Sequence, residues 1–270
     1  MYLSRDAFPP LLRAIHDPPR RLYLRGAGDP ELLTRAAIAI VGARACSPYG
    51  AQVARMLGRE LAAAGVVVVS GLARGVDSEA HRGALEADGH TVAVLGCGID
   101  RDYPAAHAGL AREITKRSLL VSEYEPGVEP APWRLPARNR IVAGLCAGTI
   151  VVEARERSGA LITADFALEE GREVFAVPGD ITSALSAGTN ALLRLGATPL
   201  TKTTDVLESL GIEAPERQAA SQPLLELLPA TADELARRSG LSAGALAAAL
   251  AELELTGLVA EGDGVYRSLA

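Results

Sequence analysis

The sequence predicts an α/β protein, with an extended Rossmann-like domain built on a mostly parallel sheet and a small C-terminal winged-helix domain. Short runs rich in Val and Ile alternate with helical stretches, which is typical of a parallel sheet buried on both faces. These runs end in glycine or small polar residues, as strands do where they enter loops. Near residue 212 the composition changes to Pro, Glu, Gln and Ala, which marks the end of the larger domain.

The larger domain is predicted over residues 31–211. Residues 1–30 contain paired prolines and a Gly-Ala-Gly stretch, so we expect an irregular lead-in with one short helix. Helices are expected at Ala51–Ala64 and Ser78–Asp88 and from Ile141 to Cys146. The predicted strands are Ile38–Val41, Val66–Val69, Thr91–Leu95, Ser118–Val121, Thr149–Val152 and Glu173–Val177.

Residues 212–222 are predicted to be a linker, and residues 223–270 a winged-helix, helix-turn-helix-like domain. In that domain Thr231-Ala232-Asp233-Glu234 is a capping box that opens a helix, and a second helix is expected at Ala243–Leu255. The turn Gly262-Asp263-Gly264 then predicts a small hairpin.

The charge of the chain is uneven along its length. The net charge is −6, and nine acidic and four basic residues lie beyond residue 211, so −5 falls on that part and −1 on the first 211 residues. The predicted recognition helix carries Glu252 and Glu254 and few cations that could bind phosphate. We therefore expect the winged-helix domain to contact protein rather than duplex DNA.

Several classes of protein are disfavoured by absent patterns. Cys46, Cys97 and Cys146 lack metal-ligand or redox spacing and the histidines are scattered, so we expect neither a metal nor a disulfide. GxGxxG does not follow the first strand, and no acid follows the second, so no dinucleotide or other cofactor is expected. Without a signal peptide or an apolar run of membrane-spanning length, a cytoplasmic protein without a membrane partner is expected.

Two strand-end loops combine small residues with arginine, at the edge where open parallel sheets bind ligands. The first runs from Gly42 through Arg44 to Ser47, and its amides, helix dipole and guanidinium suit a phosphate. The second, Ser70-Gly71 with Arg74-Gly75, repeats the combination. Asp77 is expected to cap the next helix, and a pairing of His81 with Asp77 is favoured as structural rather than catalytic.

A third candidate region contains Trp133, Arg134, Arg138, Asn139 and Arg140. Cations beside an aromatic ring are typical of a single-strand binding site, where arginine holds phosphate and a base stacks on the ring. The alternative is that Arg138 and Arg140 form internal salt bridges while Trp133 covers the core.

The same strand-end edge offers a further helix start. Ser158-Gly159 presents a hydroxyl and free amides there, after the predicted strand Thr149–Val152.

Taken in order, several stretches resemble the DNA-processing protein A (DprA/Smf) family over roughly residues 20–200. They are Ile40-Val41-Gly42-Ala43-Arg44, Ser70-Gly71-Leu72-Ala73-Arg74-Gly75-Val76-Asp77, Leu95-Gly96-Cys97-Gly98 with Tyr103-Pro104, Ser122-Glu123-Tyr124, Arg138-Asn139-Arg140-Ile141, Ser158-Gly159-Ala160-Leu161-Ile162-Thr163 and Phe175-Ala176-Val177-Pro178-Gly179.

The resemblance implies an extended Rossmann fold in a protein that is not an enzyme. It implies that the protein binds and protects incoming single-stranded DNA, loads the RecA recombinase onto it in natural transformation, and forms a homodimer through the Rossmann-like domain. The loops and the resemblance together give the expected DNA-binding residues as Gly42, Arg44, Ser47, Ser70, Gly71, Arg74, Gly75, Trp133, Arg134, Leu135, Arg138, Asn139, Arg140, Ser158 and Gly159.

The chain departs from the family pattern before its Arg-Asn-Arg stretch. Leu135 stands where relatives commonly have an aromatic residue, and Pro132 stands where they often have a lysine. We expect Trp133 and Arg134 to restore the stacking and the charge from shifted positions. The N-terminal helical domain of many relatives is expected to be missing or vestigial here.

Two other functions compete with this one. The first is a Rossmann-like nucleotide hydrolase, but Pro178-Gly179-Asp180-Ile181-Thr182 lacks the second glycine and the spaced glutamate of that family's loop. The second is a transcription regulator that senses a nucleotide and binds duplex DNA, against which the acidic C-terminal domain argues.

Overall fold

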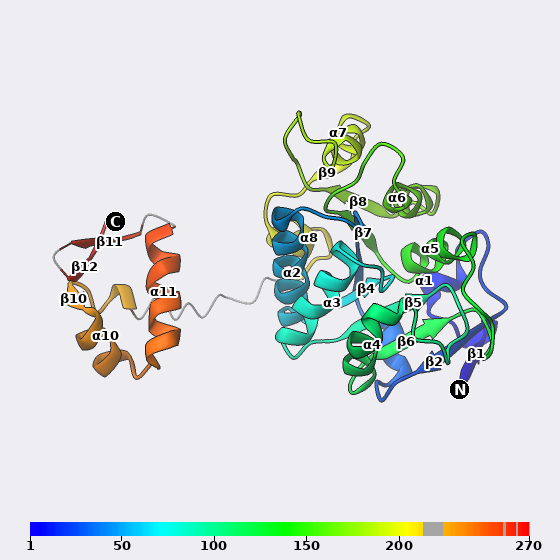
Figure 1. Cartoon of the computed structure of the whole chain (residues 1–270), viewed down its shortest axis with the longest axis horizontal. Coiled ribbons are helices and arrows are strands. Elements are labelled where there is room, and N and C mark those ends of the chain that lie inside the picture. The colour runs from blue at the N-terminus through cyan, green and yellow to red at the C-terminus, as the bar shows by residue number, and fades with distance from the viewer. Residues whose placement is uncertain (213–223, 256–257, 263, 270) are drawn as a thin grey trace. The chain divides into compact units, whose positions relative to one another are not determined.

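The computed structural model describes residues 1–212, 224–255, 258–262 and 264–269 of the 270-residue chain. It divides into two compact units, Met1–Glu213 and Ala214–Ala270, which are described separately. Figure 1 draws both units with the helices and strands named below.

The larger unit is built on a nine-stranded sheet in the order β1-β2-β6-β5-β4-β3-β7-β8-β9. From β3 to β9 all paired strands run parallel, while β1 and β2 pair antiparallel at one edge. The strands are β1 (Tyr2–Ser4), β2 (Arg21–Arg25), β3 (Ala37–Val41), β4 (Val67–Ser70), β5 (Thr91–Leu95), β6 (Leu119–Ser122), β7 (Gly148–Val151), β8 (Glu173–Ala176) and β9 (Thr198–Pro199).

Helices cover both faces of this sheet (Figure 1). Along β3, Ala39 faces one core and Ile40 the other, which explains why the strand is apolar at every position. The α-helices of this unit are α1 (Pro10–Arg13), α2 (Pro48–Ala63), α3 (Val76–Glu86), α4 (Ala108–Thr115), α5 (Arg134–Gly144), α6 (Gly159–Glu169), α7 (Ala187–Arg194) and α8 (Thr203–Ser209), with 3-10 turns at Arg5–Ala7, Pro30–Thr34 and Ala105–His107.

The chain order reverses beside β3. From β3 the chain adds β4, β5 and β6 on one side, and then returns to add β7, β8 and β9 on the other. In open α/β sheets ligands bind outside the carboxyl ends of the strands at such a switch point. The mostly parallel Rossmann-like sheet predicted from the sequence is confirmed, with its six predicted strands each within one residue of the observed bounds.

The N-terminal segment corrects the expectation of an irregular lead-in. It contains α1 but also β1 and β2, and β2 joins the main sheet antiparallel to β6. Leu22 and Leu24 are buried there, while Arg21 is exposed. The alternation was the signal for a strand, and the flanking arginines and paired prolines hid it.

The smaller unit is a winged-helix domain, as predicted. It contains α10 (Ala232–Ser239), α11 (Ala243–Leu255) and a three-stranded sheet of β10 (Ala230–Thr231), β12 (Val265–Ser268) and β11 (Val259–Gly262). The capping box is present, because Thr231 Oγ1 accepts from the Glu234 amide and Glu234 Oε2 accepts from the Thr231 amide. The predicted linker from residue 213 onward and Asp263 of the predicted turn lie outside the described residues.

Within the described parts of the chain, no helix is long and apolar enough to cross a membrane. The same residues contain no cluster of three side chains that could hold a metal ion. All three cysteines are free thiols, of which Cys97 and Cys146 are buried.

Candidate nucleic-acid interface

A groove lies at the carboxyl ends of β3, β4 and β5, against the first turns of α5 and α6. Its larger pocket has a volume of about 400 Å³, and a second pocket of about 300 Å³ continues it toward Tyr103 and Pro104. We call the two pockets together the strand-end groove. Five residues line both of them, namely Arg44, Gly71, Ala73, Leu135 and Arg138.

The groove brings together residues predicted from four separate stretches of the sequence. It adjoins the switch point beside β3, so the topology accounts for its position. The predicted residues that line it are Gly42, Arg44, Gly71, Arg74, Leu135, Arg138, Asn139, Ser158 and Gly159.

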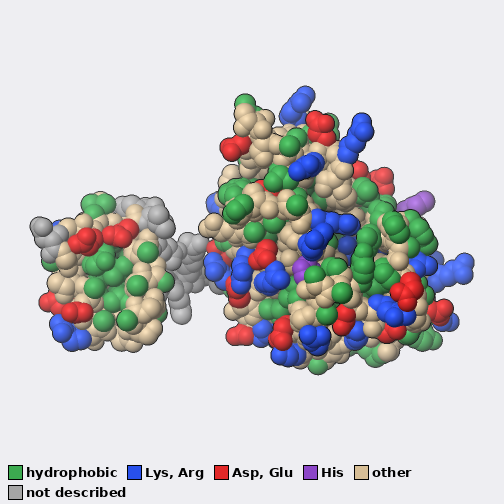
Figure 2. Space-filling view, viewed as in Figure 1, with side chains coloured by type: hydrophobic (Ala, Val, Ile, Leu, Met, Phe, Trp, Pro, Cys, Tyr) green, Lys and Arg blue, Asp and Glu red, His purple; other side chains and the backbone are tan. Residues whose placement is uncertain are grey.

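Two arginines of the groove are available to a ligand. Arg44 follows β3 and Arg74 follows β4, and both side chains are exposed. Neither forms a hydrogen bond or an ion pair with any residue that the structure describes. Figure 2 shows Lys and Arg side chains gathered near the centre of the visible face of the larger unit. Guanidinium groups whose N–H donors are unused attract phosphate.

The start of α6 adds neutral donors to the groove. Ser158 is the N-cap, and its Oγ accepts from the Ala160 amide at 3.3 Å. Asn139 in α5 ties this helix start down, because its Nδ2 donates to the Gly159 carbonyl at 3.1 Å. The free amides at the start of an eleven-residue helix favour a negative charge.

The hydrogen-bond donors of Ser47 at the start of α2 are already bound to another residue of the protein. Ser47 caps α2, but its amide and its hydroxyl both donate to the Glu153 carboxylate, at 2.8 and 2.5 Å. Glu153 is 5% exposed and comes from the end of β7. A buried carboxylate therefore occupies the place where the sequence predicted a phosphate, and Ser47 is not among the residues that line the groove.

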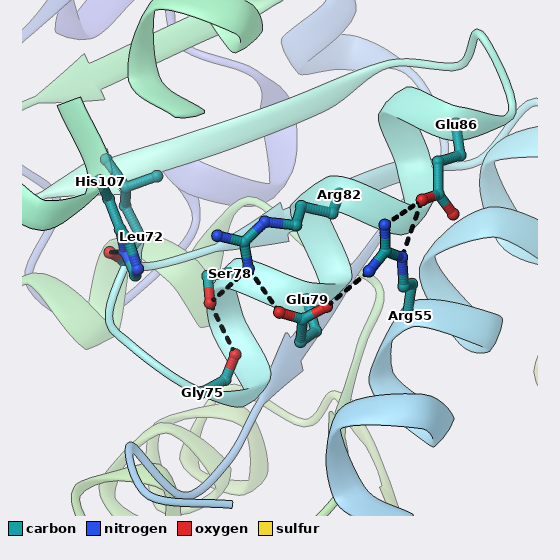
Figure 3. Close-up of polar contacts among 8 residues, drawn as sticks. All are labelled: Arg55, Leu72, Gly75, Ser78, Glu79, Arg82, Glu86 and His107. Carbon is teal, nitrogen blue, oxygen red and sulfur yellow. Dashed lines mark hydrogen bonds and ion pairs between the residues drawn. The ribbon is translucent and has the colours of Figure 1, made fainter. Parts of the chain in front are cut away.

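The loop that carries Arg74 is stabilised by hydrogen bonds to its backbone carbonyls on either side of this arginine. Leu72 has a φ of 60° and is fully buried, and its carbonyl accepts from His107 Nδ1 at 2.9 Å (Figure 3). Gly75 has a φ of 77° and is the N-cap of α3, and its carbonyl accepts from Ser78 Oγ at 2.9 Å. A side chain at Gly75 would also meet the Ala43 carbonyl. Gly75 thus shapes the loop without lining the groove.

Charged side chains lock α3 against α2 beneath that loop. Glu79 is the centre of the network in Figure 3, where it pairs with Arg55 of α2 at 3.4 Å and with Arg82 of α3. Arg55 also pairs with Glu86. The pairs of Arg55 with Glu79 and Glu86 thus link α2 to α3, the helix whose first turn follows Arg74.

Asp77 and Arg138 form the floor of the groove. The sequence predicted that Asp77 caps α3, and this was wrong, because the N-cap is Gly75. Asp77 Oδ2 instead accepts from the amides of Gly71 and Ala73 at 3.2 and 3.3 Å. Burial raises the pKa of the Asp77 carboxyl, while the charge of Arg138 acts in the opposite direction. Arg138 is 5% exposed and donates from Nη1 to the carbonyls of Gly71, at 2.6 Å, and Val94.

Two more polar residues after or near β4 are buried away from the groove. His81 forms no hydrogen bond or ion pair with Asp77; its Nδ1 lies 2.6 Å from Thr91 Oγ1, and burial lowers the pKa of His81 to about 3. The imidazole is therefore neutral, and the predicted pairing of His81 with Asp77 is not observed. Ser70 is also fully buried, with its hydroxyl donating to the Ile40 carbonyl at 2.6 Å, so the structure does not present it to a ligand.

The outer side of α5 carries the remaining predicted residues. Arg140 donates two hydrogen bonds of 2.7 Å to the Glu123 carboxylate and pairs with Asp17 at 2.9 Å, so internal pairing, the alternative for this residue, is observed. Trp133 is 61% exposed and does not cover the core. The Arg134 guanidinium lies over the Trp133 ring at 4.9 Å and over the Tyr124 ring at 5.1 Å.

Some groove residues were not predicted as part of the site. Asp77 was interpreted as a helix cap, as a structural partner of His81 and as part of a family motif, and Tyr103 and Thr163 only as parts of family motifs, yet all three line the groove. For Asp77 the available signal was its position in the first turn of the helix that follows β4.

Fold and groove together define a class of protein. It is a Rossmann-like protein with a cationic strand-end groove, joined to a winged-helix domain. Within that class, comparison with known families is specific: residues 1–211 match the DNA recombination-mediator protein A family and residues 212–264 the DprA winged helix domain. The chain belongs to the DNA recombination-mediator protein A family, and this membership gives it a role in DNA processing.

Individual relatives agree with the family match. The chain is 39% identical to Protein Smf of Escherichia coli, over 97% of this chain and 75% of that protein. It resembles the crystal structure of DprA from Streptococcus pneumoniae, with a TM-score of 0.73, 45% identity and coverage of 77% and 73% of the two chains. A structure of DNA processing protein A from Helicobacter pylori, solved to explain its binding of single-stranded DNA, has a TM-score of 0.70, 33% identity and coverage of 78% and 95%.

Proposed function

We propose that this protein binds single-stranded DNA in the strand-end groove and acts as a recombination mediator without catalytic activity of its own. The observation that carries the proposal is the pair of exposed arginines, Arg44 and Arg74, that have no hydrogen-bond or ion-pair partner among the described residues. Two guanidinium groups and the α6 helix start at one edge suit successive phosphates of a flexible strand.

The relatives support this proposal. The Helicobacter pylori protein, which covers the same fold, binds single-stranded DNA. By the same resemblance, the protein protects incoming single strands, loads RecA onto them in natural transformation, and works as a homodimer through the larger unit. The expectation of a cytoplasmic protein belongs with this role.

The test of DNA binding is fluorescence anisotropy of labelled oligo-dT over a range of salt concentrations. We expect salt-sensitive binding that Arg44→Ala weakens, with the salt slope reduced by about 0.7, as for one lost phosphate contact on a single strand. Arg35→Ala is the matched control, because Arg35 is exposed just before β3 and so lies at the amino end of that strand, whereas the groove lies at the carboxyl ends. Absence of binding by the unaltered protein would contradict the proposal.

RecA loading and dimer formation need their own experiments. RecA assembles slowly on DNA coated with single-strand binding protein, so its DNA-dependent ATPase rate reports loading. We expect the unaltered protein to raise that rate and Arg44→Ala to fail. Sedimentation of the free protein should give twice the 28.0 kDa mass of the chain. An unchanged ATPase rate would contradict RecA loading and would leave the proposal of DNA binding intact.

We propose that the winged-helix unit contacts protein rather than duplex DNA. Its helix α11 exposes mainly alanines, and two of its arginines, Arg238 and Arg267, donate to the carbonyls of Leu227 and Gly262. Few cations are thus left for phosphates among the described residues of this unit. Anisotropy with a labelled duplex should give weaker binding than with oligo-dT; the reverse order would favour a transcription regulator.

A further inference from the structure

Four aromatic side chains lie in a row beside the strand-end groove, in a chain that has few of them. The sequence contains ten aromatic residues, of which six are Tyr and one is Trp. Four of the ten form what we call the aromatic strip, namely Tyr2 of β1, Tyr23 of β2, Tyr124 after β6 and Trp133 before α5. Tyr2 is 50% exposed and Trp133 is 61% exposed, so burial in the core does not account for the row.

Each ring of the aromatic strip is linked to the next. Tyr2 and Tyr23 are paired across β1 and β2, with their ring centroids 5.7 Å apart. Tyr23 and Tyr124 line the same pocket, which has a volume of about 590 Å³. The Arg134 guanidinium lies over both the Tyr124 and the Trp133 ring, at 5.1 and 4.9 Å from their centroids. The strip therefore runs from β1 to the start of α5.

Arginines accompany these rings. Arg20 and Arg21 line the pocket of the strip, and both side chains are exposed. The Arg21 guanidinium lies 5.0 Å from the centroid of the Tyr2 ring, and Arg20 forms no hydrogen bond or ion pair with any residue that the structure describes. Residues 1–25 carry five arginines and two aspartates, a net charge of +3, whereas the first 211 residues together carry −1. Rings interleaved with cations are typical of surfaces on which bases stack while arginine binds phosphate.

Two carboxylates also line this pocket, and only one of them is paired. Glu123 is held by Arg140 through two hydrogen bonds of 2.7 Å. Glu125 is exposed and forms no ion pair within the described part of the chain. Arg20 and Arg21 therefore outnumber the one unpaired carboxylate, and the surface attracts an anionic strand. Removing the charge of Glu125 should strengthen that attraction.

The aromatic strip continues the edge of the sheet on which the groove lies. The sheet order places β6, β2 and β1 beyond β5, as Figure 1 shows. Ser122, the last residue of β6, pairs with Tyr23. After β5, a Cβ at Gly96 would lie 3.0 Å from Leu135 Cδ2 and 3.2 Å from the Arg134 carbonyl oxygen. A strand that leaves the groove past Leu135 thus meets Arg134 and then the rings of the strip.

We propose that the aromatic strip is a second binding surface for single-stranded DNA, outside the groove. Bases of the strand that leaves the groove stack on its rings, and Arg20 and Arg21 bind the phosphates between them. The inference rests on the proposed binding of single-stranded DNA in the groove and adds where the rest of the strand lies. Because every base has a π-face, stacking does not select a sequence, and the strip lengthens the covered strand without making the binding specific.

The test compares how variants bind two lengths of labelled oligo-dT in fluorescence anisotropy. The short oligomer has about 5 nucleotides and fills only the groove, and the long one has about 15, so that the two span the range of site sizes on single-strand binding surfaces. The affinity of each variant is divided by that of the unaltered protein for the same oligomer. The larger number of registers on the long strand then cancels.

Tyr2→Ala should weaken binding of the long oligomer about fivefold and leave binding of the short one unchanged, because one stacking surface is lost outside the groove. Tyr2→Phe keeps the ring and should keep the affinity. Tyr49→Ala is the matched control, because Tyr49 is 54% exposed and lines neither the groove nor the pocket of the strip.

Two charge variants should act on the long oligomer alone. Arg21→Ala should lower the salt slope of its binding by about 0.7, as for one lost phosphate contact on a single strand. Glu125→Gln should tighten its binding, because an exposed negative charge beside the phosphates is removed. A folding defect does not produce a gain in affinity, so the second result is independent of stability.

The outcomes separate this inference from the proposed function. If Tyr2→Ala and Arg21→Ala bind the long oligomer as the unaltered protein does, the strand does not follow the strip, and binding in the groove stands. Equal weakening of both oligomers would also overturn a separate surface, since it indicates a change in the groove. Failure of the unaltered protein to bind either oligomer would overturn the proposed function, and the strip with it.

Discussion

The arginines at the strand ends and the arginines of α5 are the same side chain in opposite situations. Arg44 and Arg74 are exposed after β3 and β4 and have no hydrogen-bond or ion-pair partner among the described residues. Arg138 is buried on two backbone carbonyls, and Arg140 is held by Glu123 and Asp17. All four come from stretches that resemble the same family, so the motif alone does not separate their roles.

The difference lies in how many donors are already used. A guanidinium has five N–H donors, and one whose donors are satisfied internally has less to gain from a phosphate. Arg138 and Arg140 therefore act first on the structure, and Arg44 and Arg74 on the ligand. Substitutions in the two groups should consequently affect different measurements, stability in one and DNA affinity in the other.

The largest expected effect is that of Arg138→Met on stability. The substitution leaves the carbonyls of Gly71 and Val94 without their donor and the buried Asp77 without its compensating charge. We expect the free energy of unfolding to fall by about 3–5 kcal/mol, as when one partner of a buried charged pair is removed. Urea unfolding followed by circular dichroism measures it. A loss below about 1 kcal/mol would contradict the structural role, since that is typical of a surface site.

The double variant Arg44→Ala, Arg74→Ala should leave stability nearly unchanged and weaken DNA binding. Both side chains are exposed and unpaired, so the urea midpoint should move by less than the equivalent of about 0.5 kcal/mol. The salt slope of oligo-dT binding should fall by about 1.4, twice the value for one phosphate contact. The single variants at both positions show whether the two losses add. An unchanged slope would separate these arginines from the DNA.

Much of this fold was predictable because each strand of a parallel sheet that is covered on both faces is a continuous run of apolar residues. A run such as Ile38–Val41 is apolar at every position since both faces of β3 are covered. The strand β2, which lies between β1 and β6, was missed because only Leu22 and Leu24 are buried in it. Two alternating leucines between arginines are too little to distinguish a strand from irregular chain.

The site was predictable at the level of loops but not of single side chains. The strand-end rule brought Arg44, Gly71 and Ser158 to one groove. It did not reveal that Glu153 fills the start of α2, because that contact joins residues 106 positions apart. Nor did it reveal that Arg138 turns inward, which depends on the packing of α5 against the ends of β4 and β5.

Arg140→Gln should have a smaller effect on stability than the change at Arg138. The side chain of Arg140 is 14% exposed and that of Glu123 is 17% exposed, so the bidentate pair is partly shielded from solvent. Asp17 is 75% exposed and adds little. We expect a loss of about 1 kcal/mol in urea unfolding, with unchanged affinity for oligo-dT. A clear loss of DNA affinity without a loss of stability would move Arg140 into the group of Arg44.

The smallest expected effect is that of Trp133→Ala, which tests whether the tryptophan replaces the aromatic residue that relatives have at the position of Leu135. The ring is 61% exposed and one of its faces already carries the Arg134 guanidinium, so at most one face remains for a base. We expect binding of oligo-dT to weaken about fivefold, the lower end for base stacking on an aromatic ring. Trp133→Phe should keep most of the affinity. If Trp133→Ala binds oligo-dT as tightly as the unaltered protein, the ring lies outside the path of the strand, and Leu135 alone contacts the base there.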